Sequence, residues 1–91
     1  MNRFFEKDGI QFGIDVIKNN LITLNNADLA AALSKTDWYI VRLADASSQK
    51  EIPQAIMDQR LAARTRCATI ESEIIASVSV DALKQIYTKY L

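Results

Sequence analysis

The longest regular pattern of apolar residues lies between Pro53 and Ser77. One stripe recurs there at spacings of four, three, four, three and four: Ile56, Arg60, Ala63, Cys67, Ile70 and Ile74. This period places its members on one face of an α-helix. A neighbouring row widens the apolar face: Met57, Leu61, Ala68 and Ile75. Pro53 suits a helix start, because the N–H that proline lacks is not needed in the first turn. The pattern predicts one long helix over about residues 53–76.

Shorter helices are predicted on both sides of the long one. Asn25 or Asn26 can cap a helix that ends near residue 35. Thr36-Asp37 is a second capping signal, and it favours a helix of two turns over residues 38–44, although the β-branched and aromatic residues there would also suit a strand. Residues 46–50 are polar and predict a loop. Ser77 or Ser79 can cap a last helix with these apolar positions: Val80, Leu83, Ile86, Tyr87, Tyr90 and Leu91.

The first 25 residues allow two interpretations. Apolar residues alternate over 10–16 and gather again over 21–24, on either side of Asn19-Asn20. As strands they would form a β-hairpin with an Asn-Asn turn, because asparagine tolerates positive φ. The same residues also fit a short helix over 9–19, with Ile10, Ile14 and Ile17 on one face. The hairpin is preferred, with residues 1–7 irregular.

These elements predict a mainly α fold in a single domain over residues 1–91. Its long helix would be packed by shorter helices, with the helical part over 26–91 and a hairpin or irregular arm over 1–25. Gly9, Gly13 and Pro53 are the only glycines and proline, and folds rich in sheet usually need more turn residues than that.

Charge and composition limit the classes of partner. Eleven basic and eleven acidic residues cancel, whereas nucleic-acid binders usually carry a basic excess. No stretch approaches the roughly 18–20 apolar residues that span a bilayer, and the first residues lack the apolar core of a signal peptide. Cys67 is the only cysteine, which suits a reducing cytosol. We therefore expect a cytoplasmic protein that binds neither nucleic acid nor membrane.

The residues available for chemistry argue against an enzyme. Histidine is absent, which removes Ser-His and Cys-His catalysis and, with one cysteine, nearly all zinc sites. Carboxylates that could serve a hydrolase or a metal site show no pairing in the sequence: Asp37, Asp45, Asp58, Glu71 and Glu73. We expect no catalytic residues, no metal and no cofactor.

Protein binding remains as the expected activity. Trp38 and Tyr39 are residue types favoured in binding hot spots, although a single tryptophan in a small domain is expected first as a core anchor. Arg60 and Arg64 lie four apart on one helical face and could meet an acidic partner. Alternatively they pair within the chain, with the stem of Arg60 packed because it falls on the apolar stripe.

A family resemblance covers residues 33–64. The run Thr36-Asp37-Trp38-Tyr39-Ile40-Val41-Arg42 is followed by a polar loop, by Ile52-Pro53, and then by Ile56, Arg60, Ala62-Ala63 and Arg64. This order resembles a segment of phage tail-fibre assembly and tail-assembly-chaperone-like proteins. The loop here lacks the glycine expected in that family, and residues 1–32 and 65–91 match no family.

The resemblance implies a bacteriophage or prophage tail-assembly accessory protein in the host cytosol or the virion. Its partner would be a phage tail or tail-fibre protein. The chain could also form a homo-oligomer. The residues implied in partner binding are Trp38, Tyr39, Arg42, Arg60 and Arg64. They could equally hold the Trp38 helix onto the long one. The alternatives are a minor virion structural protein that self-associates through helices, and a small regulator that binds a host protein.

Overall fold

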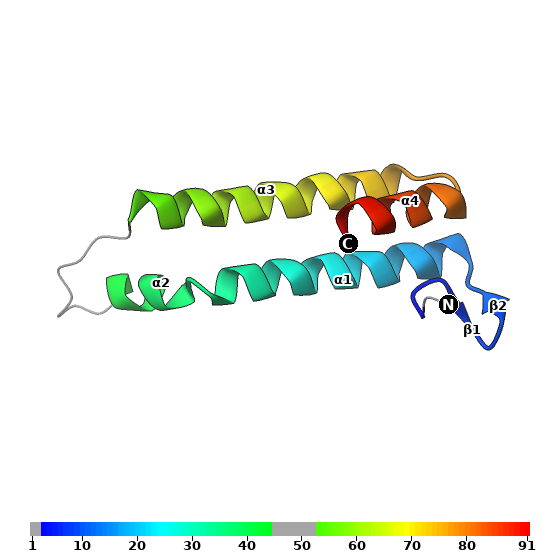
Figure 1. Ribbon diagram of the computed structural model, residues 1–91, viewed down its shortest axis with the longest axis horizontal. Helices are drawn as coiled ribbons and strands as arrows, with labels where there is room; N and C mark the ends of the chain where they lie inside the picture. Colours follow the sequence, from blue (N-terminus) through cyan, green and yellow to red (C-terminus); the bar gives the residue numbers. More distant parts are fainter. Residues whose placement is uncertain (1–2, 45–52) are drawn as a thin grey trace.

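The fold was obtained as a computed structural model, which describes residues 3–44 and 53–91, with only the backbone of residues 42–44. Within these residues the chain forms a two-stranded hairpin and four helices (Figure 1). The elements in chain order are β1 (Glu6–Lys7), β2 (Ile10–Gln11), α1 (Ile14–Ser34), α2 (Asp37–Ala44), α3 (Gln54–Ala76) and α4 (Val80–Tyr90). The loop expected over residues 46–50 lies outside the described residues.

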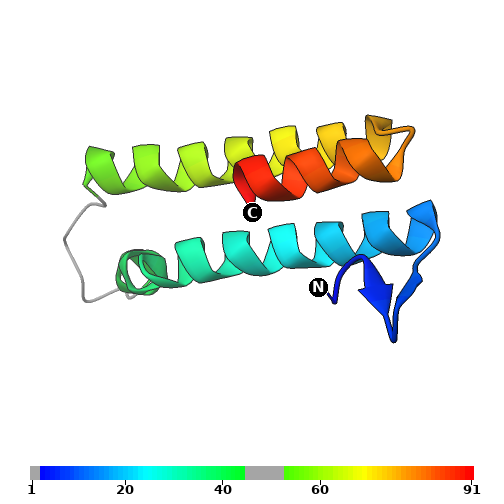
Figure 2. The ribbon, with the colours of Figure 1, turned by 45° about the vertical axis from the view of Figure 1, so that its right-hand side comes forward.

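Helices α1 and α3 run side by side in opposite directions and give the molecule its long axis (Figures 1 and 2). Helix α4 turns back along the C-terminal half of α3 and also contacts α1. Helix α2 continues past the C-terminal end of α1, at the opposite end of the molecule from α4. The principal extents of 56 × 23 × 17 Å show how elongated this arrangement is.

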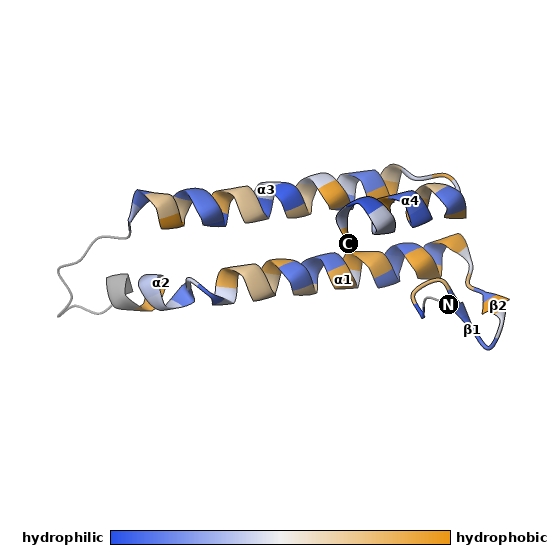
Figure 3. Cartoon of the chain, in the orientation of Figure 1, coloured by the Kyte–Doolittle hydropathy of each residue, from blue (hydrophilic) through white to orange (hydrophobic). Residues whose placement is uncertain are grey.

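The hydrophobic core occupies only the end of the molecule where α4 lies. Its fully buried members come from the N-terminal arm and from α1, α3 and α4: Phe5, Ile17, Leu21, Ile70, Ile74 and Leu83. Tyr87 packs edge-on against the Phe5 ring, with the ring centroids 5.6 Å apart, and Tyr90 and Leu91 also lie against the core. The hydropathy colouring shows apolar residues on the facing sides of α1, α3 and α4 at this end (Figure 3). Within the described residues, the other half of the helix pair therefore has no third helix packed across it.

The mainly α fold, its long helix and its N-terminal hairpin are confirmed, but the hairpin is not where the apolar pattern placed it. Lys7 pairs with Ile10 and Glu6 with Gln11 in an antiparallel ladder. The turn is Asp8-Gly9, with φ of 54° and 78°, the positive values that a tight two-residue hairpin turn requires. Residues 6–7, expected to be irregular, are the first strand.

The predicted Asn-Asn turn and the predicted helix start at Asn25 or Asn26 are both wrong, because α1 runs through all of these residues. The shorter helix considered over residues 9–19 is also wrong, since the helix begins at Ile14 and is 21 residues long. Asn25 is 1% exposed, and its Nδ2 donates to the carbonyl oxygen of Cys67 at 2.9 Å. This bond to another helix occupies a side chain that would otherwise compete for the backbone of its own helix.

The other helices begin and end close to the predicted positions. Helix α3 starts directly after Pro53 and ends at Ala76. Ser79 caps α4, because its side-chain oxygen accepts from the N–H of Ala82 at 3.2 Å. In the described part of the chain, no helix combines the length and the apolar character needed to cross a bilayer.

Candidate functional site

Polar side chains join α1 to α3 at intervals along the helix pair. Near the core end, the Nζ of Lys18 donates to the carbonyl oxygen of Ile75 at 2.9 Å. In the middle, Asn25 bonds to the carbonyl of Cys67, whose buried thiol lies 3.7 Å from the Oδ1 of Asn26. At the far end, Arg60 of α3 reaches the junction between α1 and α2. Side-chain hydrogen bonds therefore join the two helices beyond the hydrophobic core.

Arg60 forms the most developed of these contacts. It is 9% exposed, and its Nη1 lies 3.0 Å from the carbonyl oxygen of Leu33, 2.8 Å from the Oγ1 of Thr36 and 3.0 Å from the Oδ1 of Asp37. Leu33 is in the last turn of α1, and Asp37 is the first residue of α2. Arg60 thus holds the start of α2 against α3. The expectation that its stem is packed is confirmed.

Helix α2 presents apolar side chains to solvent beyond this contact. Trp38, Ile40 and Val41 are 47%, 42% and 68% exposed, and we call these three residues the α2 surface. Among the described residues, no Cα of α2 comes within 8 Å of a Cα of α3 or α4. The expectation that Trp38 anchors the core is wrong, because the core lies at the other end of the molecule.

The remaining residues implied by the resemblance are placed differently from one another. Tyr39 is half-buried, and its ring centroid lies 3.7 Å from that of Trp38. Arg64 is exposed, one turn along α3 from Arg60 and closer to the middle of the molecule. Arg42 belongs to α2, and its side chain lies outside the described atoms. The structure therefore brings Trp38, Tyr39 and Arg60 to the same end of the molecule.

Ile40 and Val41 are surface residues that were not predicted from the sequence. A signal was available, because residues 38–41 are apolar in every position and a two-turn helix with such a run must expose some of it unless it is buried on all sides. Packing against a core was assumed for this helix, and the position of α2 beyond the core could not be read from its own residues.

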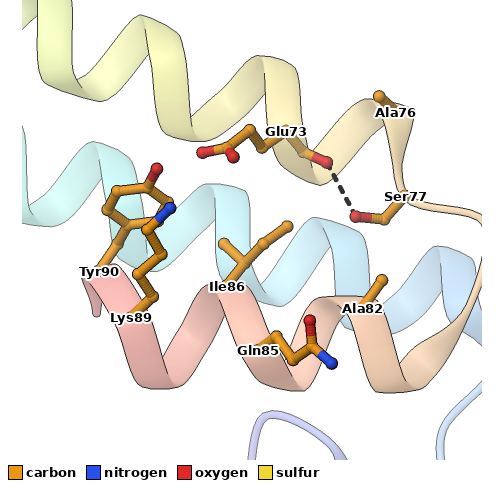
Figure 4. A pocket seen from close by; sticks show the side chains of 8 residues that line it. All are labelled: Glu73, Ala76, Ser77, Ala82, Gln85, Ile86, Lys89 and Tyr90. Atoms are coloured by element: carbon orange, nitrogen blue, oxygen red, sulfur yellow. Dashed lines mark hydrogen bonds between the residues drawn. The ribbon is translucent and has the colours of Figure 1, made fainter.

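A shallow pocket lies between the C-terminal part of α3 and α4 (Figure 4). Glu73 contributes a carboxylate whose Oε2 is buried and, within the described residues, has no hydrogen-bond partner. A hydrogen bond with Tyr90, followed by the negative charges of Tyr90 and Glu73, raises the pKa of the Lys89 ammonium above its ordinary value. Glu73 is half-buried because α4 turns back over this part of α3.

The carboxylates named from the sequence are dispersed along the described part of the chain. Asp37 pairs with Arg60, and Asp58 accepts a bond from Gln54 one turn away, at 2.8 Å. The side chains of Glu71 and Glu73 project from α3 in different directions. Asp45 lies outside the described residues. Within the described residues no three His, Cys, Asp or Glu side chains gather in a group that could hold a metal ion.

Comparisons of the chain with protein-family models, with curated proteins and with solved structures find no match.

Proposed function

We propose that this chain is a non-enzymatic protein-binding module that contacts its partner through the α2 surface. The observation that supports this best is the placement of α2, where three apolar side chains are exposed on a helix held to the rest of the chain at its first turn. Tryptophan is enriched among the few residues that carry most of the binding energy of a protein interface, and burial of the neighbouring apolar side chains adds the free energy of removing them from water.

The residues of this end have different roles in the proposal. Trp38 and Val41, which are three residues apart and share one side of α2, would be the contact residues, with Tyr39 supporting the Trp38 ring. Arg60 is a positioning residue, because its guanidinium is used inside the chain. Arg64 is exposed and would supply a positive charge beside the contact.

We further propose that the partner is a phage tail or tail-fibre subunit and that binding takes place in the host cytosol during tail assembly. This step rests on the resemblance of residues 33–64, where the contact and positioning residues named above fall. The proposed binding involves no cofactor, no nucleic acid and no membrane. An assembly factor of this kind would shield an apolar surface of the subunit until that surface is buried in the tail.

The test compares two matched substitutions in an affinity capture from bacteria in which the phage or prophage encoding the chain is producing particles. Val41→Ser removes apolar area from the α2 surface, whereas Val16→Ser makes the same change at a 47% exposed position in the first turn of α1, at the other end of the molecule. Burial of one valine side chain contributes about 1–2 kcal/mol. We therefore expect Val41→Ser to weaken capture of the tail or tail-fibre subunit about 5- to 30-fold, with Val16→Ser unchanged. Equal capture by both variants would show that the α2 surface does not contact the partner.

A further inference from the structure

We propose that the chain forms a symmetric dimer in which the α3 helices of two copies pack antiparallel along a second stripe. This second stripe lies one residue on from the buried one and has the same spacings of four, three, four, three and four: Met57, Leu61, Arg64, Ala68, Glu71 and Ile75. A helix that repeats such spacings on two adjacent faces can pack against two neighbours. Helix α1 is the first neighbour, and the proposed second neighbour is another copy of α3.

The second stripe is open to solvent at five of its six positions, and Glu71 is half-buried. Met57, Leu61 and Ile75 are 50%, 64% and 59% exposed, and Arg64 and Ala68 are also exposed. On a helical wheel, three half-buried residues of α1 fall on the same side of the helix pair and extend the apolar face: Ile22, Leu29 and Leu33. The bond from Lys18 to the carbonyl of Ile75 joins the two helices on this side.

Helix α4 covers the opposite side of the pair, so it leaves the second stripe free. Glu73 and Ser77 line the pocket against α4, and the guanidinium of Arg66 donates to the carbonyl oxygen of Tyr90. At 100° per residue, Arg66 and Glu73 lie about 160–180° around α3 from the middle of the second stripe. One side of the helix pair thus has a covering helix, and the other has apolar residues without one in the described part of the chain.

The exposed area is of the size that a dimer needs. The chain exposes 6351 Å², about 1,000 Å² more than the roughly 5,300 Å² expected for a folded monomer of 10.2 kDa. A stable interface of standard size buries about 800 Å² on each partner. The excess over a compact monomer of this mass is comparable with the area that each partner buries in such an interface.

The charged residues of the second stripe favour an antiparallel orientation of the second copy. A parallel dimer would place Arg64 opposite Arg64 and Glu71 opposite Glu71, and like charges at such positions are repulsive. An antiparallel alignment with Met57 opposite the second copy's Ile75 places Arg64 opposite Ala68. It leaves each Arg64 within about 4.5 Å, along the axis, of the other copy's Glu71. Apolar residues then meet at both ends, and two opposite-charge pairs flank the centre, where Ala68 permits close approach of the helices.

Sedimentation velocity of the purified chain, without any partner protein, tests the dimer over about 1–200 µM. We expect a monomer–dimer equilibrium that Leu61→Glu weakens at least tenfold, while Ala62→Glu, on a different face of α3, leaves it unchanged. Val41→Ser should also leave it unchanged, which separates this inference from the proposed function. A wild-type chain that remains monomeric up to 200 µM would overturn the dimer.

Charge exchange tests the orientation with substitutions at a single pair. Arg64→Glu and Glu71→Arg should each weaken self-association, because each places like charges together in both pairs of the dimer. A mixture of the two single variants should form heterodimers about as tightly as the wild-type chain associates, since each pair then joins opposite charges again. Single variants that dimerise as well as wild type, or a mixture that does not recover, would exclude the antiparallel arrangement.

Discussion

Substitution of Arg60 by alanine gives the sharpest test of what holds the far end of the molecule together. The Nη1 atom faces three acceptors, the carbonyl of Leu33, the hydroxyl of Thr36 and the carboxylate of Asp37. It carries two hydrogens, so two of these bonds can be well directed at one time. A hydrogen bond from a charged donor contributes about 1.5–3 kcal/mol. The Asp37 side chain is 56% exposed, and an ion pair to such a group contributes at most about 1 kcal/mol.

The loss is reduced because the acceptors keep other partners. The Leu33 carbonyl still receives the N–H of Thr36 at 3.0 Å, and the Thr36 hydroxyl still donates to the same carbonyl at 3.2 Å. We therefore expect Arg60→Ala to lower the free energy of unfolding by about 2–3 kcal/mol. Asp37→Asn removes only the charge of the exposed partner and should cost less than about 1 kcal/mol.

Urea denaturation followed by far-UV circular dichroism would measure both changes, at a protein concentration where sedimentation shows monomer alone. Arg64→Ala is the matched control, since it is the same change one turn along α3 at an exposed side chain, and it should alter stability by less than about 0.5 kcal/mol. If Arg60→Ala and Arg64→Ala had the same effect, the contact would contribute nothing to folding and the reasoning would be refuted.

Two other substitutions test the turns and caps. Ser79→Ala removes the side-chain cap of α4 and should lower the free energy of unfolding in urea by about 1 kcal/mol. Ser72→Ala, at an exposed position inside α3, is the control. A smaller loss of stability for Ser79→Ala than for Ser72→Ala would contradict the capping role. Gly9→Ala places a Cβ at a φ of 78° and should cost about 1–2 kcal/mol. Gly13→Ala should cost less, about 0.5–1 kcal/mol, because alanine adopts the φ of −61° without strain and is only a poorer N-cap for α1. The reverse order in thermal melts would show that the Asp8-Gly9 turn is not formed.

The elements from residue 36 onward could be predicted because their ends carry local signals. Pro53 marks the start of α3, Ser79 is the cap of α4, and Thr36-Asp37 marks the start of α2. The spacing of the apolar stripe identified the buried face of α3, including Arg60, whose burial is unusual for a charged residue. These signals depend on neighbours in the sequence, so they do not require knowledge of the fold.

Helix α1 could not be predicted in the same way, because the residue that misled the interpretation donates its hydrogen bond to another helix. Asn25 has the chemistry of a helix cap, and only the carbonyl of Cys67, 42 residues away in the sequence, gives its side chain a different partner. The hairpin is a different case. Asp8-Gly9 is a strong local turn signal, but the hairpin was predicted from the longer alternation of apolar residues that follows it.

The candidate site was located in part. Trp38, Tyr39 and Arg60 do lie at one end of the molecule, and Arg60 does join the Trp38 helix to the long helix. The exposure of Trp38 was not foreseen, because it follows from where α4 ends and not from the residues of α2. The second stripe on α3 was treated as a widening of the buried face, although its one-residue offset from the buried stripe turns it away from α1.

The central claim is that this chain binds a protein of the phage tail. The most direct test is capture of the tagged full chain from bacteria in which the phage or prophage encoding it is producing particles, with identification of bound proteins by mass spectrometry. We expect recovery of a tail or tail-fibre subunit, with its capture weakened about 5- to 30-fold by Val41→Ser and unchanged by Val16→Ser. Recovery of host proteins alone, or of nothing beyond the tagged chain, would contradict it.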